Sequence, residues 1–325
     1  MKATAIAPSN IAFIKFWGKT NDKLNLPQNS SISVNLSNLH STTTVEFDPK
    51  FKKDVVIIDG SMQQKETLRT TKHLNVIRKL ANIKTFAKVV SKNNFPKGSG
   101  LASSASGFAA LTLAAAKAAN LKLSEKELTT IARLGSGSAS RSIPDGFVKW
   151  EKGSNHQTSY AHSLHSANFW KINILAIIIS TSHKKISSTE GHSAAKSSPF
   201  FKIRIAKIED KIRNLETVIR YKDFKKFGQI IEKEALELHA IALTSNPPII
   251  YLLPESIKIM LLCQKLRETD TDVYFTFDAG PQPVLFCLQK DSQKIERAIK
   301  NEVRKARIIK STPADGAKII TNHLF

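Results

Sequence analysis

Cysteine is scarce in this chain, since Cys263 and Cys287 are the only two among 325 residues. Two cysteines cannot build the disulfide framework that is typical of small secreted proteins. Both stand in apolar surroundings, so we expect them to fill the core rather than to act as nucleophiles. Long apolar runs are also absent. The longest, at residues 174–179, is far shorter than a membrane span and predicts a buried strand.

Other features of exported or repetitive proteins are missing as well. The first six residues have neither the long apolar segment nor the cleavage site of a signal peptide. No internal repeat, heptad pattern or low-complexity linker stands elsewhere in the sequence. These absences predict a cytoplasmic protein with no membrane partner.

Acidic residues are few beside basic ones, with 27 Asp and Glu against 49 Lys and Arg and a net charge of +22. The basic residues are spread along nearly the whole chain and are densest at 202–226 and 289–310. A nucleic-acid-binding protein instead gathers them with aromatic residues on one face. We therefore expect no nucleic-acid partner, and a solvated basic surface that can steer small polyanionic substrates.

Nine histidines invite a metal interpretation, above all His156, His162 and His165. No Cys or Glu completes a usual zinc ligand spacing around these three residues, which disfavours zinc. The sequence therefore names no metal ligands.

The order of apolar patterns predicts a mixed α+β chain. Strands are expected at 4–17, 31–47, 84–90, 146–151, 171–180, 272–277, 283–288, 306–310 and 317–321. Helices are expected at 64–82, 106–119, 124–134, 200–219, 222–243, 255–267 and 291–301. Ser124 and Glu127 have the spacing of a capping box, and a polar loop is expected around residues 19–29. A chain of this length is expected to form two lobes or two domains, with the site between them.

The small-residue turn at 100–107 is the most informative segment, because it runs directly into an apolar helix. The first N–H groups of a helix have no intrahelical partners and attract anions, and glycine and serine there allow close approach and add donors. The segment predicts a phosphate site, with a plain serine-capped helix start as the alternative. It is not a Walker A loop, because no Gly-Lys-Ser/Thr follows its last glycine. It is not a dinucleotide fingerprint, because its glycine spacing differs.

Two lysines, Lys15 and Lys19, flank the aromatic pair Phe16-Trp17 near a strand end. On a regular strand both would point to one face, where a phosphorylated ligand could meet two ammonium groups. A half-buried strand with a solvated lysine at its tip is an equal alternative.

Three later segments also carry chemistry-bearing residues. Arg141 stands among four serines in the segment 135–142 and offers a fork for a carboxylate or a phosphate. The segment 184–191 joins lysine and hydroxyl residues before a helix, although it could be only a helix cap. Asp278 follows a strand and precedes a tight turn, a position typical both of turn-forming aspartates and of side chains that point into clefts.

Ten motifs in this order carry a resemblance to a known family over nearly the full length. They are Asn10-Ile11-Ala12 with Lys15-Phe16-Trp17-Gly18-Lys19, Leu26-Pro27-Gln28-Asn29-Ser30-Ser31-Ile32-Ser33, Asn94-Phe95-Pro96, Gly100-Leu101-Ala102-Ser103-Ser104-Ala105, Gly135-Ser136-Gly137-Ser138-Ala139-Ser140-Arg141-Ser142, Phe147-Val148-Lys149-Trp150, Ser187-Ser188-Thr189-Glu190-Gly191, His239-Ala240, Pro247-Pro248 and Phe277-Asp278-Ala279-Gly280-Pro281. Together they resemble the diphosphomevalonate (mevalonate 5-diphosphate) decarboxylase family of the GHMP kinase superfamily.

The resemblance implies a two-lobed GHMP-kinase-like α+β fold. A ribosomal protein S5 domain 2-like, ATP-binding lobe would cover residues 1–182, a ferredoxin-like lobe would cover 183–325, and the active site would lie in the cleft between them. It also implies a homodimer. The implied activity is the ATP-dependent decarboxylation of mevalonate 5-diphosphate to isopentenyl diphosphate, with release of ADP, phosphate and CO2, in the mevalonate pathway of isoprenoid biosynthesis.

The resemblance assigns roles to particular residues. Asp278 would accept or orient the proton of the substrate's 3-hydroxyl, Arg141 would clamp its carboxylate, and Lys15 would support the charge around the transferred phosphoryl group. The substrate would also contact Asn10, Phe16, Lys19, Ser136, Ser138 and Ser188. ATP with Mg²⁺ would bind at Gly98, Gly100, Leu101, Ala102, Ser103, Ser104 and Ala105.

Some residues depart from the family pattern. Phe16 stands where the family usually has Tyr, Ser140 replaces its usual Cys, and Gln282 replaces its usual Asn. The missing tyrosine hydroxyl commonly helps to bind the 5-diphosphate. A phosphomevalonate decarboxylase that acts on the 5-monophosphate is therefore the alternative, followed by a mevalonate 3-kinase. An inactive basic binding protein, of a different class, would be expected to lose Asp278 or Arg141 and to cluster its basic residues.

Overall fold

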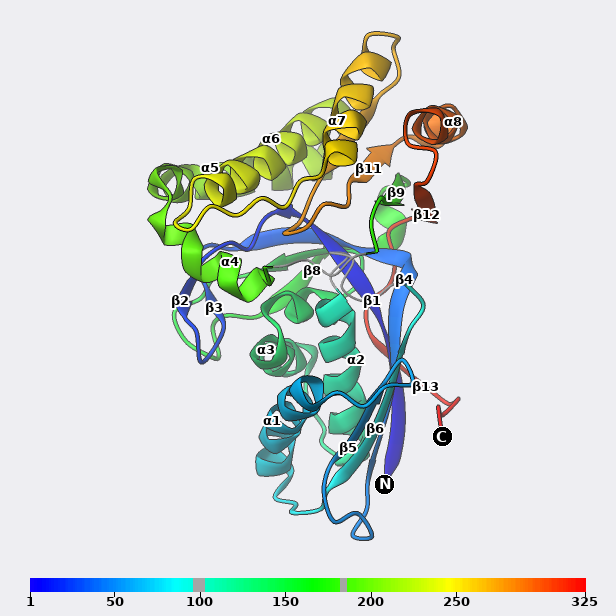
Figure 1. Ribbon diagram of the computed structural model, residues 1–325. Coiled ribbons are helices and arrows are strands. Elements are labelled where there is room, and N and C mark those ends of the chain that lie inside the picture. The colour runs from blue at the N-terminus through cyan, green and yellow to red at the C-terminus, as the bar shows by residue number, and fades with distance from the viewer. Residues whose placement is uncertain (96–102, 182–185) are drawn as a thin grey trace.

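The computed structural model describes residues 1–95, 103–181 and 186–325, and in Figure 1 a large sheet dominates its lower part and helices its upper part. The strands of the large sheet are β1 (Lys2–Ile14), β4 (Ser31–Phe47), β5 (Val55–Ile58), β6 (Ala87–Asn93), β7 (Phe147–Trp150), β8 (Ala161–His165) and β13 (Lys318–Ile320). Their order is β13-β1-β4-β6-β5, with β7 paired to β4 and β8 paired to β7. Two short strands, β2 (Lys19–Asn21) and β3 (Leu26–Pro27), pair with each other beside it.

Strand β4 organises this sheet, because it pairs with β1 along most of its length and with two strands on its other edge. Its first residues pair with β7 and its last seven with β6. The pairing of β1 with β4 is irregular between Ala12 and Ile14, one residue before Lys15. Such bulges bend a strand and redirect its side chains.

Three helices, α1 (Gln64–Ala81), α2 (Ser103–Ala118) and α3 (Glu125–Gly135), pack with the large sheet around one apolar core (Figure 1). Helix α2 is rich in alanine, and Ala109, Ala110 and Ala114 are fully buried. Their small side chains let the helix approach the equally small Ala5 and Ala7 of β1 in the same core. This close packing fixes the start of α2 against the middle of the sheet.

A second sheet has the strand order β10-β11-β9-β12, and all its neighbouring strands are antiparallel. Its strands are β9 (Asn173–Ile178), β10 (Val273–Thr276), β11 (Val284–Cys287) and β12 (Arg307–Ser311), and the helices around it are α5 (Pro199–Tyr221), α6 (Phe224–Leu243), α7 (Pro254–Arg267) and α8 (Ser292–Glu302). Strand β9 reads as a continuous apolar run because both of its faces are buried. Ile174 and Ala176 belong to one core, and Leu175 and Ile177 belong to another.

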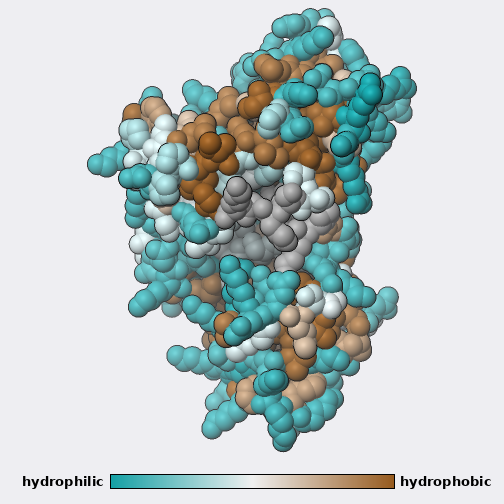
Figure 2. Space-filling view, in the orientation of Figure 1, coloured by the Kyte–Doolittle hydropathy of each residue, from teal (hydrophilic) through white to brown (hydrophobic). Residues whose placement is uncertain are grey.

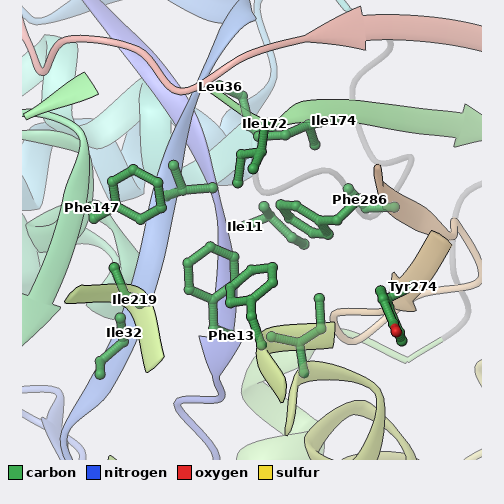
Figure 3. Close-up of a cluster of buried hydrophobic side chains, with 14 of the residues drawn as sticks. Ile11, Phe13, Ile32, Leu36, Phe147, Ile172, Ile174, Ile219, Tyr274 and Phe286 are labelled. Atoms are coloured by element: carbon green, nitrogen blue, oxygen red, sulfur yellow. The ribbon is translucent and has the colours of Figure 1, made fainter. Parts of the chain in front are cut away.

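An aromatic core joins the two sheets and surrounds Phe13 of β1 (Figure 3). The ring of Phe13 lies edge-on to Phe227 of α6 at 4.9 Å and to Phe286 of β11 at 5.5 Å, measured between centroids. Phe147 of β7 and Ile174 of β9 belong to the same cluster. Because Phe13 stands two residues before Lys15, this core holds the end of β1 between the two sheets.

Most expected helices and strands are confirmed, and so are the capping box of Ser124 with Glu127 and the buried, unpaired state of both cysteines. Four expected boundaries are wrong. The strand expected at 84–90 lies three residues further along the chain, as β6 (Ala87–Asn93). The first strand ends at Ile14 because side chains bind the Lys15 backbone, the loop at 19–29 contains β2 and β3, and helix α2 already begins at Ser103.

Besides β2 and β3, two further strands are not expected from the sequence, namely β5 and β8. Each lies at the end of a row of paired strands, and β8 mixes histidine and serine with its apolar residues. Such a strand has no clear alternation of apolar and polar positions to reveal it. The domain division at 182/183 stays a prediction, although β9 precedes it and pairs with β11 and β12. Among the described residues, no helix is long and apolar enough to span a bilayer.

Candidate active site

Lys15 lies just past the end of β1 and is almost fully buried. Its Nζ donates to Oδ1 of Asp278 at 2.8 Å and to the carbonyl oxygen of Ala12 at 2.6 Å. Burial lowers the pKa of Lys15, while the carboxylates of Asp278 and Glu234 oppose this shift. The ammonium group therefore depends on nearby acidic side chains to stay protonated.

Asp278 follows β10 in a tight turn, where the Gly280 N–H donates to the Asp278 carbonyl at 2.7 Å. Its side chain is 23% exposed, whereas that of Lys15 is 2% exposed. The carboxylate thus pairs with a buried cation on one side and remains open to a ligand on the other. This arrangement brings together two residues from different sheets, as a site between two lobes requires.

Arg141 belongs to η1 (Gly137–Ser142) and is also buried. Its Nε and Nη2 donate to Oδ1 of Asn10 at 3.3 and 3.2 Å, and its Nη1 donates to Oγ of Ser31 at 2.8 Å. Burial lowers the pKa of Arg141 to about 10, and the nearby charge of Asp278 opposes the shift. The hydrogen bonds to Asn10 and Ser31 orient the guanidinium before any ligand binds.

Asn10 links Arg141 to the serines of η1. Its Nδ2 donates to Oγ of Ser142 at 2.8 Å and to the carbonyl of Ser138 at 3.1 Å. Ser136 then connects η1 to the helix start, since its Oγ donates to Oγ of Ser104 at 3.2 Å. The expected substrate residues Asn10, Ser136 and Ser138 thus form one continuous polar path between Arg141 and α2.

Lys15 and Lys19 do not lie on one regular strand, because β1 ends at Ile14 and Lys19 begins β2, so the expectation of one shared strand face is wrong. Phe16 packs against Trp150 and His192, with ring centroids 4.7 and 4.1 Å apart. Lys19 lies in β2, and its Nζ donates to Oδ1 of Asn25 at 2.8 Å. Burial lowers the pKa of Lys19, and Asp22 opposes this shift.

Ser188 is the first residue of α4 (Ser188–Ala194) and is half-buried. The preceding Ser187 caps this helix in a capping box with Glu190, which confirms the helix-cap interpretation for this part of the segment. Lys184 and Lys185 lie outside the described residues. A substrate contact by Ser188 stays a prediction. The cap and such a contact are compatible, because they use different hydroxyl groups.

A cavity of about 110 Å³ lies beside the first turns of α2, between this helix, α1 and the strands β4, β5 and β6. Its polar lining residues include Thr43, Ser91, Asn93, Ser103 and Ser104, and its apolar ones include Val89, Phe108 and Leu111. An apolar cavity with a few polar groups suits a small planar ligand, and the adjoining helix start suits a phosphate. Ser103 and Ser104 line this cavity, and their role in nucleotide binding stays a prediction.

The other expected nucleotide residues divide into two groups. Ala105 lies in the first turn of α2 and is fully buried, so only its backbone could face a ligand. Gly98, Gly100, Leu101 and Ala102 lie outside the described residues. Their part in nucleotide binding stays a prediction.

Metal binding has no preformed protein cage in the described residues, where no group of three or more His, Cys, Asp or Glu side chains could hold an ion. His156 contacts Arg133, His162 contacts Glu151 at 3.1 Å, and His165 stacks on Phe169. Mg²⁺ usually binds through one or two protein groups and substrate phosphates. The serine hydroxyls beside the cavity fit that kind of site better than a zinc site.

Two buried side chains that lie outside the sequence motifs also contact Lys15. Glu234 of α6 accepts from the Lys15 N–H at 3.1 Å, and Arg204 of α5 donates to the Lys15 carbonyl at 2.9 Å. Their neighbours along each helix are rich in lysine and glutamate, so the sequence resembles a solvated helix face. Only the positions of Glu234 and Arg204 at the buried side of the helical pattern could have revealed them.

Two family models match the chain: the diphosphomevalonate decarboxylase-like N-terminal domain over residues 7–161, and the mevalonate 5-diphosphate decarboxylase C-terminal domain over residues 174–321. Diphosphomevalonate decarboxylase of Candida albicans is 38% identical over 311 residues, which are 90% of this chain and 86% of that protein. The crystal structure of mevalonate diphosphate decarboxylase from Staphylococcus aureus has a TM-score of 0.93 at 37% identity and covers 98% of each chain.

A solved structure of MDDEF in complex with MVAPP, AMPPCP and magnesium has a TM-score of 0.94 at 36% identity and covers 99% of each chain. These similarities extend over both sheets and confirm the two-lobed, GHMP-kinase-like α+β fold. Because both family models match and a relative is 38% identical over nine tenths of this chain, the chain belongs to the diphosphomevalonate decarboxylase family.

Proposed function

We propose that this chain catalyses the ATP-dependent decarboxylation of mevalonate 5-diphosphate to isopentenyl diphosphate, with release of ADP, phosphate and CO2. This is a carboxy-lyase reaction of the mevalonate pathway of isoprenoid biosynthesis. The observation that carries the proposal is the Lys15–Asp278 ion pair with the buried Arg141 beside it. The bound MVAPP, AMPPCP and magnesium of the similar MDDEF structure support the same substrates and Mg²⁺ for this chain.

Asp278 is suited to the first step, because its partly exposed carboxylate can accept the proton of the substrate's 3-hydroxyl. The hydroxyl oxygen attacks the γ-phosphorus of ATP, the bond to the bridging oxygen of ADP breaks, and the proton moves to Asp278. The ammonium of Lys15, 2.8 Å from this carboxylate, stabilises the negative charge around the transferred group.

Arg141 is suited to the second step. In the described part of the chain, three of its guanidinium N–H groups bind Asn10 and Ser31, which leaves one N–H on each terminal nitrogen. These two can bind the substrate's carboxylate as a pair. When phosphate leaves C3, positive charge develops there, and the carboxylate departs as CO2 while its electron pair forms the alkene.

The cavity beside α2 is the proposed nucleotide site, with Ser103 and Ser104 at its phosphate end. Their hydroxyls and the first-turn N–H groups can bind phosphate oxygens. Mg²⁺ held between these hydroxyls and the phosphates would neutralise charge on the transferred group. The path from Ser104 through Ser136 to η1 joins this site to Arg141.

The similar proteins named above support none of the alternatives, because all of them are diphosphomevalonate decarboxylases. Phe16 nevertheless makes the phosphate chain of the substrate the property to measure first. Its ring packs against His192 and Trp150, and because it has no hydroxyl it offers no hydrogen bond to a second phosphate.

The test gives purified protein ATP and Mg²⁺ with mevalonate, its 5-phosphate or its 5-diphosphate, and measures ADP and CO2 together. We expect equal amounts of both products, and only with the 5-diphosphate. ADP without CO2 would indicate a kinase, and CO2 only from the 5-phosphate would indicate the monophosphate enzyme. No product from any of the three would refute an enzymatic function in this pathway.

The expected homodimer and cytoplasmic location also remain proposals. Figure 2 shows hydrophobic surface over the upper part of the molecule, where α5, α6 and α7 lie in Figure 1. Exposed apolar side chains on and just before α7 include Ile250, Leu253, Ile257 and Leu261. Such a patch supports a subunit contact. Light scattering over a range of concentrations should give twice the 36.0 kDa chain mass, and a monomer at all of them would contradict the dimer.

A further inference from the structure

Helix α6 carries a fully buried carboxylate, Glu234, that the proposed chemistry does not use. Glu234 forms ion pairs with Arg204, which is 4% exposed, and with Lys211, whose Nζ lies 2.6 Å from Oε2. Burial alone would raise the pKa of Glu234, but the charges of Arg204 and Lys211 outweigh it and keep the pKa below its usual value. The carboxylate is therefore a fixed buried charge.

The Glu234–Arg204 ion pair binds both the N–H and the carbonyl group of the Lys15 backbone. Oε1 of Glu234 accepts from the Lys15 N–H at 3.1 Å, and Nη2 of Arg204 donates to the Lys15 carbonyl at 2.9 Å. Nδ2 of Asn29 donates to the same carbonyl at 3.0 Å, and Arg204 also contacts Oδ1 of Asn29. Side chains thus replace the strand partners of Lys15 at the point where β1 ends.

A buried ion pair adds little to stability compared with apolar residues of similar size, because removing both charges from water is costly. The position of the ion pair is better explained by geometry, because Glu234, Arg204 and Asn29 all bind the backbone of Lys15. Lys15 projects its ammonium from that residue to Asp278 at 2.8 Å. A shift of the Lys15 backbone would change the separation of these two groups directly.

We propose that Glu234 and Arg204 are positioning residues for the reaction, which hold the Lys15 backbone so that its ammonium faces Asp278 and the transferred phosphoryl group. This inference rests on the proposed function. Glu234 also contributes its charge, because it is one of the two carboxylates that stabilise the protonated form of Lys15. The charged and titratable groups that face Lys15 are Asp278 after β10, Glu234 and His239 of α6, Arg141 of η1 and Arg204 of α5.

The test compares Glu234→Gln with Glu237→Gln as the matched control. Glu237 lies one turn further along α6 and also binds Lys211, but it is 30% exposed and is remote from the Lys15 hydrogen bonds. In Glu234→Gln we expect kcat to fall about 10- to 100-fold, the range that a small misplacement of reacting groups costs. KM for both substrates should stay within about threefold of wild type, as expected when ground-state binding is retained.

The pH profile separates positioning from a purely structural role. Glu234 raises the pKa of Lys15, so its neutralisation should move the alkaline limb of kcat to lower pH. Glu237→Gln should leave that limb in place. Arg204→Lys keeps the charge but loses the planar fork, so it should lower kcat without moving the limb. A lower melting temperature with unchanged kcat and pH profile in Glu234→Gln would overturn the proposal.

A readout independent of turnover keeps this inference distinct from the proposed function. Titration of the Lys15 side chain by ¹³C NMR should give a lower pKa in Glu234→Gln than in Glu237→Gln or the wild type. An equal Lys15 pKa in all three would overturn the electrostatic part, whatever the reaction. Absence of CO2 release by the wild type, together with the expected NMR difference, would refute the proposed function and leave the contact of Glu234 with Lys15 supported.

Discussion

The ammonium group of Lys15 lies 2.8 Å from Oδ1 of Asp278, although the two residues are 263 positions apart in the chain. One follows strand β1 of the large sheet, and the other follows the edge strand β10 of the second sheet. The aromatic core around Phe13 holds these strands together just behind the pair. The ion pair is therefore a direct consequence of how the two sheets pack.

Replacement of Asp278 by Asn should lower kcat about 10³-fold or more, because an amide cannot accept the proton of the substrate hydroxyl and no longer pairs with the Lys15 charge. The measurement is the release of ADP and CO2 at saturating ATP and 5-diphosphate. Circular dichroism and nucleotide binding should match the wild type. Near wild-type turnover would refute the role of Asp278.

Replacement of Arg141 by Lys should lower kcat/KM for the 5-diphosphate about 10²-fold or more. Lysine keeps a positive charge, but with only three N–H donors it cannot bind Asn10 and Ser31 and also donate a pair of hydrogen bonds to a substrate carboxylate. The KM for ATP serves as an internal control, because the nucleotide cavity is lined by other residues. Unchanged kcat/KM would contradict the carboxylate clamp.

The three central residues can be predicted from the sequence because each stands in a short motif of unusual composition. Lys15 flanks an aromatic pair, Arg141 stands among serines, and Asp278 precedes a tight turn. The motifs do not show which partner each of these side chains contacts. The sequence offers no direct signal that Lys15 and Asp278 form an ion pair, because that contact depends on the packing of two sheets.

The two side chains that bind the Lys15 backbone are harder to predict, for a different reason. Glu234 and Arg204 lie on long helices rich in lysine and glutamate, where most charged residues face water. A buried charged residue in such a helix differs from its neighbours only in its place on the apolar face. The short strand β5 is also missed by the sequence pattern, because its four residues are too few to show a strand period.

Substitutions at Gly107 should test the nucleotide cavity. Gly107 lines this cavity on α2, and a Cβ built at this position meets no heavy atom within 4 Å. Leucine there would extend into the cavity, so Gly107→Leu should raise the KM for ATP about tenfold or more, as expected for a binding loss of about 1.4 kcal/mol or more. Gly107→Ala should have a smaller effect.

Initial rates at varied ATP measure this series, and kcat at saturating ATP is the internal control. KM should rise in the order Gly, Ala, Leu while kcat changes little, because Lys15 and Asp278 are not touched. A KM for ATP that is the same in all three proteins would place the nucleotide elsewhere.

Acid should destabilise the protein through two buried histidines, His73 and His239. Burial lowers the pKa of both to about 4, and the charge of Lys15 adds to this effect at His239. Each has one ring nitrogen without a hydrogen-bond partner among the described residues. Between pH 6.5 and 4 the unfolded chain takes up protons that the folded chain does not, so the free energy of unfolding falls as pH falls.

The expected loss is up to about 1.4 kcal/mol per pH unit for each histidine over this range. Urea denaturation at several pH values should show a shallower pH dependence in His73→Gln, because that side chain no longer titrates. His162→Gln is the matched control, since His162 is half-exposed and pairs with Glu151 at the surface. A neutral buried His73 requires the free energy of unfolding to depend less steeply on pH in His73→Gln than in the wild type. An equal pH dependence in His73→Gln, His162→Gln and the wild type would show that the acid sensitivity comes from other groups.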